Sequence, residues 1–145
     1  MKKSMFFVKL MCYAAVLCAV LFTANPNARA MTLSDLQGDY RIVEQSGKQQ
    51  LNLYHSEGSI INLSMINGDL TGKVKKAAAN AAVKNGAIVI SSVYVDEGVV
   101  HCMYSCSGQF FEQASGIIEI YDGGQTLKVF AKDDPQEWFW RLKRL

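Results

Sequence analysis

The chain has 145 residues, of which 50% are hydrophobic and 19% are charged, with four Cys, two Pro and a formal net charge of +2. This composition is typical of one globular domain and excludes a disordered or fibrous protein. The charge is unevenly distributed, because all 13 acidic residues lie at or after Asp35, whereas Lys2, Lys3, Lys9 and Arg29 lie near the start. The two parts of the chain therefore need separate interpretation.

The first thirty residues have the three regions of a secretory signal peptide. Three lysines are followed by an apolar run from Leu10 to Phe22, and then by a polar stretch that ends in Ala28-Arg29-Ala30, a small-x-small pattern. The alternative is an uncleaved membrane anchor, but the apolar run spans only about 20 Å as a helix, less than the ~30 Å hydrocarbon core. We predict cleavage after Ala30 and a periplasmic or extracellular location.

Residues 31–145 then form a single exported domain, with no stable membrane span in the mature form. Eight Lys and three Arg stand against 13 acidic residues in this part, which gives a net charge of −2. A mildly acidic, mixed surface argues against nucleic-acid binding. The chain also has no phosphate-binding Gly-rich loop followed by Lys and Ser or Thr, and we expect no cofactor.

Only Cys102 and Cys106 remain after cleavage, and an oxidising compartment favours a disulfide between them. In a straight strand their Cα atoms would lie about 13 Å apart, too far for that bond, so a disulfide requires a bend at residues 103–105. Two alternatives are a redox-active pair and, with His101, a metal site. Catalytic dithiols usually have two residues between the cysteines and a structural zinc site needs four ligands, so we expect neither.

From Gly38 onward, short apolar or alternating segments are separated by turn residues, which predicts β-strands. Four places between these segments are suited to tight hairpin turns: Asn67-Gly68, Asn85-Gly86, Asp96-Glu97-Gly98 and Gly123-Gly124. Strands joined by such turns are antiparallel neighbours. The predicted strands are 38–45, 50–55, 59–66, 69–75, 87–95, 99–104, 108–112, 116–121, 125–132 and 137–142.

Two segments could be helical. Thr32 or Ser34 could cap a single turn that reaches Leu36, and the Ala-rich run from Lys76 to Lys84 is either helix or hairpin. A meander of eight to ten strands in 115 residues avoids exposed edges by closing, so we predict an all-β antiparallel meander closed or nearly closed into a small barrel.

The start of the predicted domain resembles the first strand of the lipocalin and calycin families. Gly38-Asp39-Tyr40 follows the short helical turn, as the family's Gly-x-Trp does, with Tyr in the position of Trp. In the last strand, Arg141 or Arg144 could supply the basic residue that packs over that aromatic ring near the closed end. The resemblance implies a barrel that binds a small molecule or lipid, or an exported inhibitor built on a similar barrel.

The residues indicate binding rather than catalysis. The two His residues of the chain, His55 and His101, share apolar faces of their strands, and no nucleophile-elbow pattern or carboxylate pair outside a turn is present. Aromatic side chains supply large contact areas with few rotatable bonds. The predicted ligand-binding residues are Tyr40, His55, Tyr94, His101 and Trp138.

Our leading expectation is therefore a non-enzymatic protein that binds a small apolar or amphipathic ligand inside the barrel, because strands such as 87–95 are apolar on both faces. The alternative is a protein-binding inhibitor or immunity-type module, with Met103 to Gly108 held by the disulfide as a rigid loop that contacts an exported partner. A small hydrolase is a third, less favoured reading.

Overall fold

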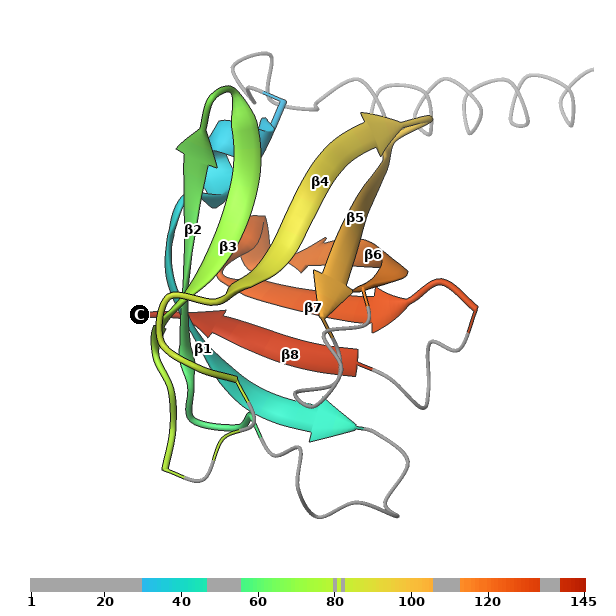
Figure 1. The fold of residues 1–145 in the computed structure, drawn as a ribbon. Helices are drawn as coiled ribbons and strands as arrows, with labels where there is room; N and C mark the ends of the chain where they lie inside the picture. Colours follow the sequence, from blue (N-terminus) through green and yellow to red (C-terminus); the bar gives the residue numbers. More distant parts are fainter. Residues whose placement is uncertain (1–29, 47–55, 80, 82, 106–112, 134–138) are drawn as a thin grey trace, which may run out of the picture. The chain divides into compact units, whose positions relative to one another are not determined.

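The computed structural model describes residues 30–46, 56–79, 81, 83–105, 113–133 and 139–145 (Figure 1). In these residues, eight antiparallel strands form a meander that closes into a barrel, because β8 pairs with β1. The strands are β1 (Gly38–Ser46), β2 (Ile60–Ile66), β3 (Asp69–Lys76), β4 (Ile88–Asp96), β5 (Val99–Ser105), β6 (Gln113–Tyr121), β7 (Thr126–Ala131) and β8 (Phe139–Arg144). The predicted all-β barrel is confirmed. The predicted strands 50–55 and 108–112 lie outside the described residues.

Tight turns determine which strands are neighbours. Asn67 and Gly68 between β2 and β3 have φ of 52° and 89°, and Glu97 and Gly98 between β4 and β5 have φ of 48° and 79°. Positive φ at both central residues is the type I′ hairpin geometry, whose twist matches that of the flanking strands. The turns predicted from the sequence therefore set the antiparallel order.

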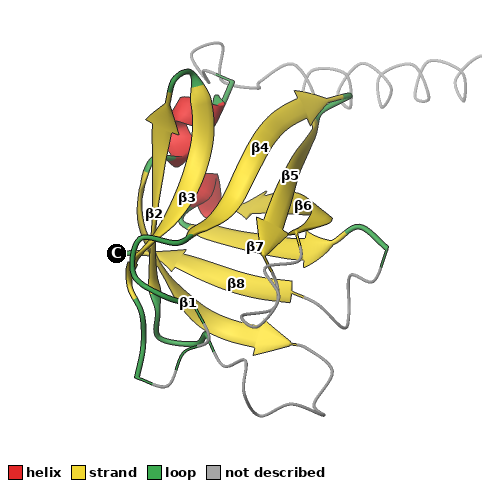
Figure 2. Cartoon of the chain, viewed as in Figure 1, coloured by secondary structure: helices red, strands yellow, loops and turns green. Residues whose placement is uncertain are grey.

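The barrel has two different ends. One end, which we call the turn end, carries the turns 67–68 and 97–98 and the connection 122–125, which contains the short η2 (Asp122–Gly124). The 3₁₀ turn η1 (Leu33–Leu36) also lies at this end. The strands β1, β3, β5 and β7 finish at the opposite end, which we call the loop end. Figure 2 shows the two short helical turns beside the strands.

The Ala-rich run does not form a helix in the residues of it that are described. The backbone N–H groups of Ala77 and Ala78 bond to side chains instead of helix carbonyls. The Ala77 N–H donates to Asn85 Oδ1 at 2.6 Å, and the Ala78 N–H donates to Ser59 Oγ at 2.9 Å. Val83 is 7% exposed and belongs to the core. Side-chain acceptors and the burial of Val83 thus outweigh the helix propensity of alanine, and the run is the β3–β4 connection.

Side chains alternate between the inside and the outside of the barrel. In β5, Cys102 and Tyr104 are 3% and 1% exposed, whereas Val99, His101 and Met103 face outward. In β2, the apolar set Ile61 and Leu63 points inward, as the alternation predicts. The buried interior is formed by Leu36, Tyr40, Ile42, Ile61, Leu63, Leu70, Val74, Val83, Val89, Ile90, Val93, Cys102, Tyr104, Ile118, Leu127, Val129, Ala131, Trp140 and Leu142.

Candidate functional site

The turn end is closed by a cluster around Tyr40. The Tyr40 side chain is 0% exposed, and its hydroxyl lies 3.0 Å from the Leu36 carbonyl oxygen and 3.1 Å from that of Gly124, so it can donate to either. Arg144 Nε donates to the same hydroxyl at 3.1 Å, and the guanidinium lies 5.2 Å from the ring centre. Arg144, rather than Arg141, is therefore the basic residue that packs over this aromatic ring.

Arg144 also ties the last strand to the N-terminal segment. Its Nη2 donates to the carbonyl oxygens of Asp35 and Gln37 at 2.8 and 2.9 Å. η1 begins where the Thr32 N–H donates to Asp35 Oδ2 at 2.7 Å, as expected of a short capped turn. Tyr40 was predicted to bind a ligand, but these contacts use its hydroxyl and one ring face within the protein.

The interior is filled by side chains at two levels. A Cβ added to Gly116 would lie 2.7 Å from Tyr104 Cδ1 and 3.0 Å from the Phe130 carbonyl oxygen. A Cβ added to Gly72 would lie 2.9 Å from Ile90 Cβ. Toward the loop end, the rings of Tyr104 and Trp140 pack edge to face with centres 5.9 Å apart. Beside these two glycines, the interior side chains leave no room for one extra methyl group.

Cys102 is a free, buried thiol within this interior. The bend predicted at residues 103–105 is wrong, because β5 continues through Ser105 and each of these residues is paired with β6. Burial raises the pKa of the Cys102 thiol to about 12, which disfavours the thiolate that redox exchange requires. Cys106 lies outside the described residues, as does most of the loop that the expected disulfide was to hold.

A row of apolar and aromatic side chains crosses the outer wall of the barrel. The registers pair Tyr94 with His101, His101 with Ile117, Ile117 with Phe130, and Phe130 with Phe139. Tyr94 is 56% exposed, and its ring stacks on that of His101 with centres 4.9 Å apart and an angle of 13° between the planes. We call these five residues the outer row. It spans β4 to β8 on the face away from the lumen.

A groove lies beside the outer row, between the tip of the β4–β5 hairpin and the end of β6. It encloses about 600 Å³, within the range of small-ligand sites. Pairing between β5 and β6 ends at Val100 and Ile118, whereas β6 continues to Tyr121. The groove is lined by Gly98, Val99, Val100, Ile117, Ile118, Glu119, Ile120, Tyr121 and Phe130.

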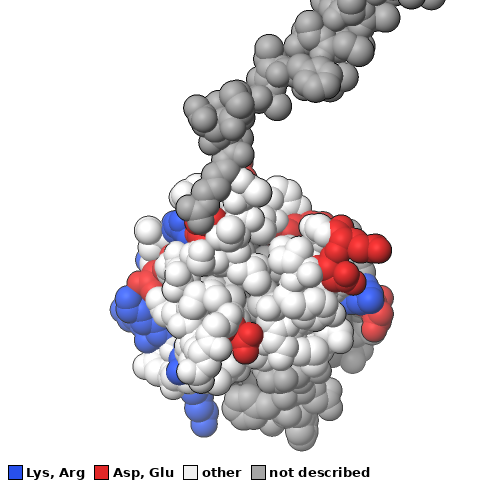
Figure 3. All heavy atoms as spheres, turned by 90° about the horizontal axis from the view of Figure 1, so that it is seen from above, with Lys and Arg blue, Asp and Glu red and all other residues white. Residues whose placement is uncertain are grey.

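Acidic side chains surround this mainly apolar groove. Glu119 is part of the lining, Asp96 and Glu97 lie at the hairpin tip beside Gly98, and Asp122 follows Tyr121; all four are exposed. Figure 3 looks onto the turn end and shows a group of acidic side chains on one side, with most of the visible basic ones opposite. The groove thus lies in a negative part of the surface, which favours a positively charged ligand.

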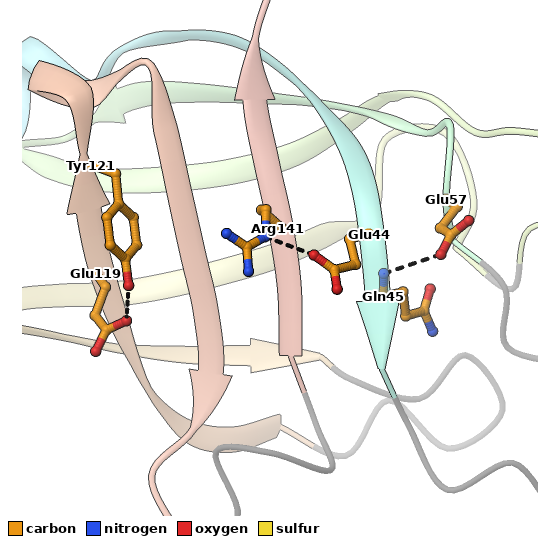
Figure 4. A network of polar contacts seen from close by, with 6 residues as sticks. All are labelled: Glu44, Gln45, Glu57, Glu119, Tyr121 and Arg141. Atoms are coloured by element: carbon orange, nitrogen blue, oxygen red, sulfur yellow. Dashed lines mark hydrogen bonds and ion pairs between the residues drawn. The ribbon is translucent and has the colours of Figure 1, made fainter.

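Polar side chains of β6, β8 and β1 make hydrogen bonds and an ion pair on the outer surface of the barrel near the groove (Figure 4). The Tyr121 hydroxyl donates to Glu119 Oε2 at 2.5 Å, and this bond raises the pKa of the tyrosine above its ordinary value. Two strands away, Arg141 Nε donates to Glu44 Oε2 at 2.7 Å. Lys128 lies between them, with Nζ 5.1 and 4.9 Å from the ring centres of Phe130 and Phe139. Lys128 and Arg141 therefore face aromatic rings and Glu44, respectively.

The structure brings together only part of the predicted site. Tyr94 and His101 lie side by side on the outer wall, whereas Tyr40 is buried at the turn end. His55 and Trp138 lie outside the described residues. The sequence analysis missed Ile117 and Tyr121, whose position at a groove depends on strand register and on the separation of β5 from β6.

The described residues give no support for a metal site at His101 and Cys102. Alternation places the imidazole outside the barrel and the thiol inside, so the two cannot coordinate one ion. Among the residues searched, no three His, Cys, Asp or Glu side chains come together as metal ligands.

In the part of the chain that the structure describes, no helix has the length and apolar character needed to cross a membrane.

The chain was compared with protein-family models, curated proteins and solved structures, and none of the three comparisons finds a match.

Proposed function

We propose that residues 31–145 are an exported, non-enzymatic binding protein that holds an amphipathic ligand in the groove between the β4–β5 hairpin and β6. The observation that carries the proposal is the groove of about 600 Å³, lined by Val99, Ile117, Ile120 and other apolar side chains. We place the site on the outer wall rather than in the lumen, where side chains pack closely against Gly72 and Gly116. Apolar lining with few polar groups is typical of small-ligand sites.

The charge of the surroundings indicates the chemistry of the ligand. Glu119 contributes a carboxylate to the lining, and Asp96, Glu97 and Asp122 stand around it. The apolar body of the ligand would lie against Val99 and the isoleucines, and a cationic group would lie near Glu119. We therefore propose a ligand with an apolar body and a positive charge.

We also propose that the barrel is calycin-like. Three features support this relationship: a closed meander of eight strands, a short 3₁₀ turn before the first strand, and Arg144 packed over Tyr40 at the closed end. In this reading, Tyr40 and Arg144 hold the barrel together, and binding occurs elsewhere.

Calorimetric titration with alkyl probes tests the function. Decyltrimethylammonium, kept far below micelle formation, should bind residues 31–145 more tightly than decyl sulfate does. Ile117→Ser should weaken its binding about three- to tenfold because apolar contact is lost. Val43→Ser is the matched control, since Val43 is 45% exposed on β1.

The charge contribution has its own control. Glu119→Gln should weaken binding of the cationic probe about threefold, as expected for an exposed charge pair. Asp69→Asn, at an exposed position on β3, should leave it unchanged. Equal binding of the two probes, or equal effects of the groove and control variants, would contradict the proposal.

A further inference from the structure

The end of β6 has a strand partner on one side only among the described strands. Glu119, Ile120 and Tyr121 pair with Lys128, Leu127 and Thr126 of β7. On the other side, pairing with β5 stops at Val100 and Ile118, because the chain turns back at residues 97–98 into β4. This three-residue edge, about 10 Å long at strand spacing, borders the groove.

A strand edge in a groove is suited to one kind of ligand. Alternation along β6 directs the backbone N–H and C=O of Ile120 toward the space that β5 would occupy if its pairing continued, whereas the backbone groups of Glu119 and Tyr121 face β7. An extended peptide can bond to Ile120 by strand addition. Small amphiphiles offer no backbone N–H and C=O to pair with those of Ile120. The backbone geometry thus favours a peptide over other cationic ligands.

The side chains beside this edge specify an alternating pattern. Ile118 and Ile120 point to one face of β6, where Val100 also lies, whereas Glu119 and Tyr121 point to the other. A strand added next to β6 would place successive side chains on the same two faces. One face therefore requires apolar residues, and the other requires residues that complement the Glu119 carboxylate.

From these observations we infer that the groove binds an extended segment of a partner protein, in which basic and apolar residues alternate, by strand addition to Glu119–Tyr121 of β6. This inference rests on the proposed function and names the chemical class of the ligand. The exposed Asp96 and Glu97 precede Gly98 of the lining and add negative charge at the hairpin end of the groove, which extends the preference for lysine or arginine beyond one position.

The test uses a blocked six-residue peptide that alternates lysine and valine, titrated into ¹⁵N-labelled residues 31–145. We expect the largest amide shifts at Glu119–Tyr121, slower hydrogen exchange of the Ile120 amide, and cross-strand proton contacts between peptide and β6. A peptide N-methylated at its valines, one of which would lie opposite Ile120, keeps the side chains but cannot donate to the Ile120 carbonyl oxygen, and it should bind at least tenfold more weakly. A peptide that alternates glutamate and valine should also bind at least tenfold more weakly.

The outcomes separate the two proposals. If decyltrimethylammonium binds at the groove but the lysine–valine peptide does not, or if N-methylation has no effect on peptide affinity, strand addition is wrong and the proposed function stands. If neither the peptide nor the alkyl cation binds, both proposals fail. Glu119→Gln should lower peptide affinity while Asp69→Asn does not, which confirms that the measured binding occurs at this groove.

Discussion

The guanidinium of Arg144 joins the last strand to the segment before the first one. It donates to the Tyr40 hydroxyl and to two backbone carbonyl oxygens, and it lies over the Tyr40 ring. A planar group with several fixed donors can make all these contacts at once, whereas an ammonium group on a flexible stem cannot. The resemblance to calycins implied a basic residue over the aromatic ring, but the choice between Arg141 and Arg144 required the register of β8.

Arg144→Lys should lower the free energy of unfolding by about 1–3 kcal/mol, because at least one buried acceptor loses its donor. Urea unfolding of residues 31–145 measures this. Arg41→Lys, at an exposed position on β1, serves as the control and should change stability by less than about 0.5 kcal/mol. Equal unfolding midpoints for the two variants would show that the Arg144 contacts contribute little.

Cys102 makes stability depend on pH in the alkaline range. Its pKa is about 12 in the folded state against 9.0 for an unperturbed thiol, so the unfolded chain loses this proton first. The stability contribution is complete below pH 9 and is lost as the pH rises from 9 toward 12, by at most about 1.4 kcal/mol per pH unit. The stability difference between the wild-type domain and Cys102→Ala should therefore shrink between pH 8 and pH 10.5. A constant difference in urea unfolding would argue against a buried, protonated thiol.

At the level of single elements, turn chemistry was the most reliable guide. Asn67-Gly68 and Glu97-Gly98 form the expected hairpins because few residues adopt positive φ at low cost. Helix propensity was a poor guide for the Ala-rich run, because it takes no account of contacts with the rest of the chain. Its structure depends on Asn85, which directly follows the run, and on Ser59, which is distant in sequence; their side-chain oxygens accept from the backbone of the run.

The Tyr104 ring of β5 packs against Gly116 of the neighbouring strand β6. Gly116→Ala should cost about 1–3 kcal/mol, since the new methyl group would overlap Tyr104. Thermal unfolding measures the cost, and Ser115→Ala on the outer face of the same strand is the control. In a Tyr104→Leu background the same glycine substitution should cost less, because the overlapping ring is gone. An equal cost in both backgrounds would place its origin in the backbone instead.

Across the whole molecule, closure of the barrel could be predicted because an open sheet of this size leaves edges and an apolar face exposed. The filled interior could not, since it depends on Tyr104 lying over Gly116 from a neighbouring strand. The outer row could not be predicted from the sequence either. The register shift between Ser91 and Tyr94 in β4 places Tyr94 opposite His101, and no pattern within one strand reveals that shift.

The pairing of β1 with β8 brings the two ends of the domain together. The Leu145 N–H donates to the Asp39 carbonyl oxygen at 2.9 Å, and Arg144 reaches Asp35 and Gln37. A short glycine-serine linker could therefore join residue 145 to residue 31, and the gene could instead begin at β6 and end at β5. Such a circular permutant should keep the barrel's circular dichroism spectrum and unfold cooperatively. Failure to fold would show that the order of synthesis matters here. In this permutant the linker would join β8 directly to β1. These two strands, which are the most distant in the natural sequence, would then be consecutive in the chain.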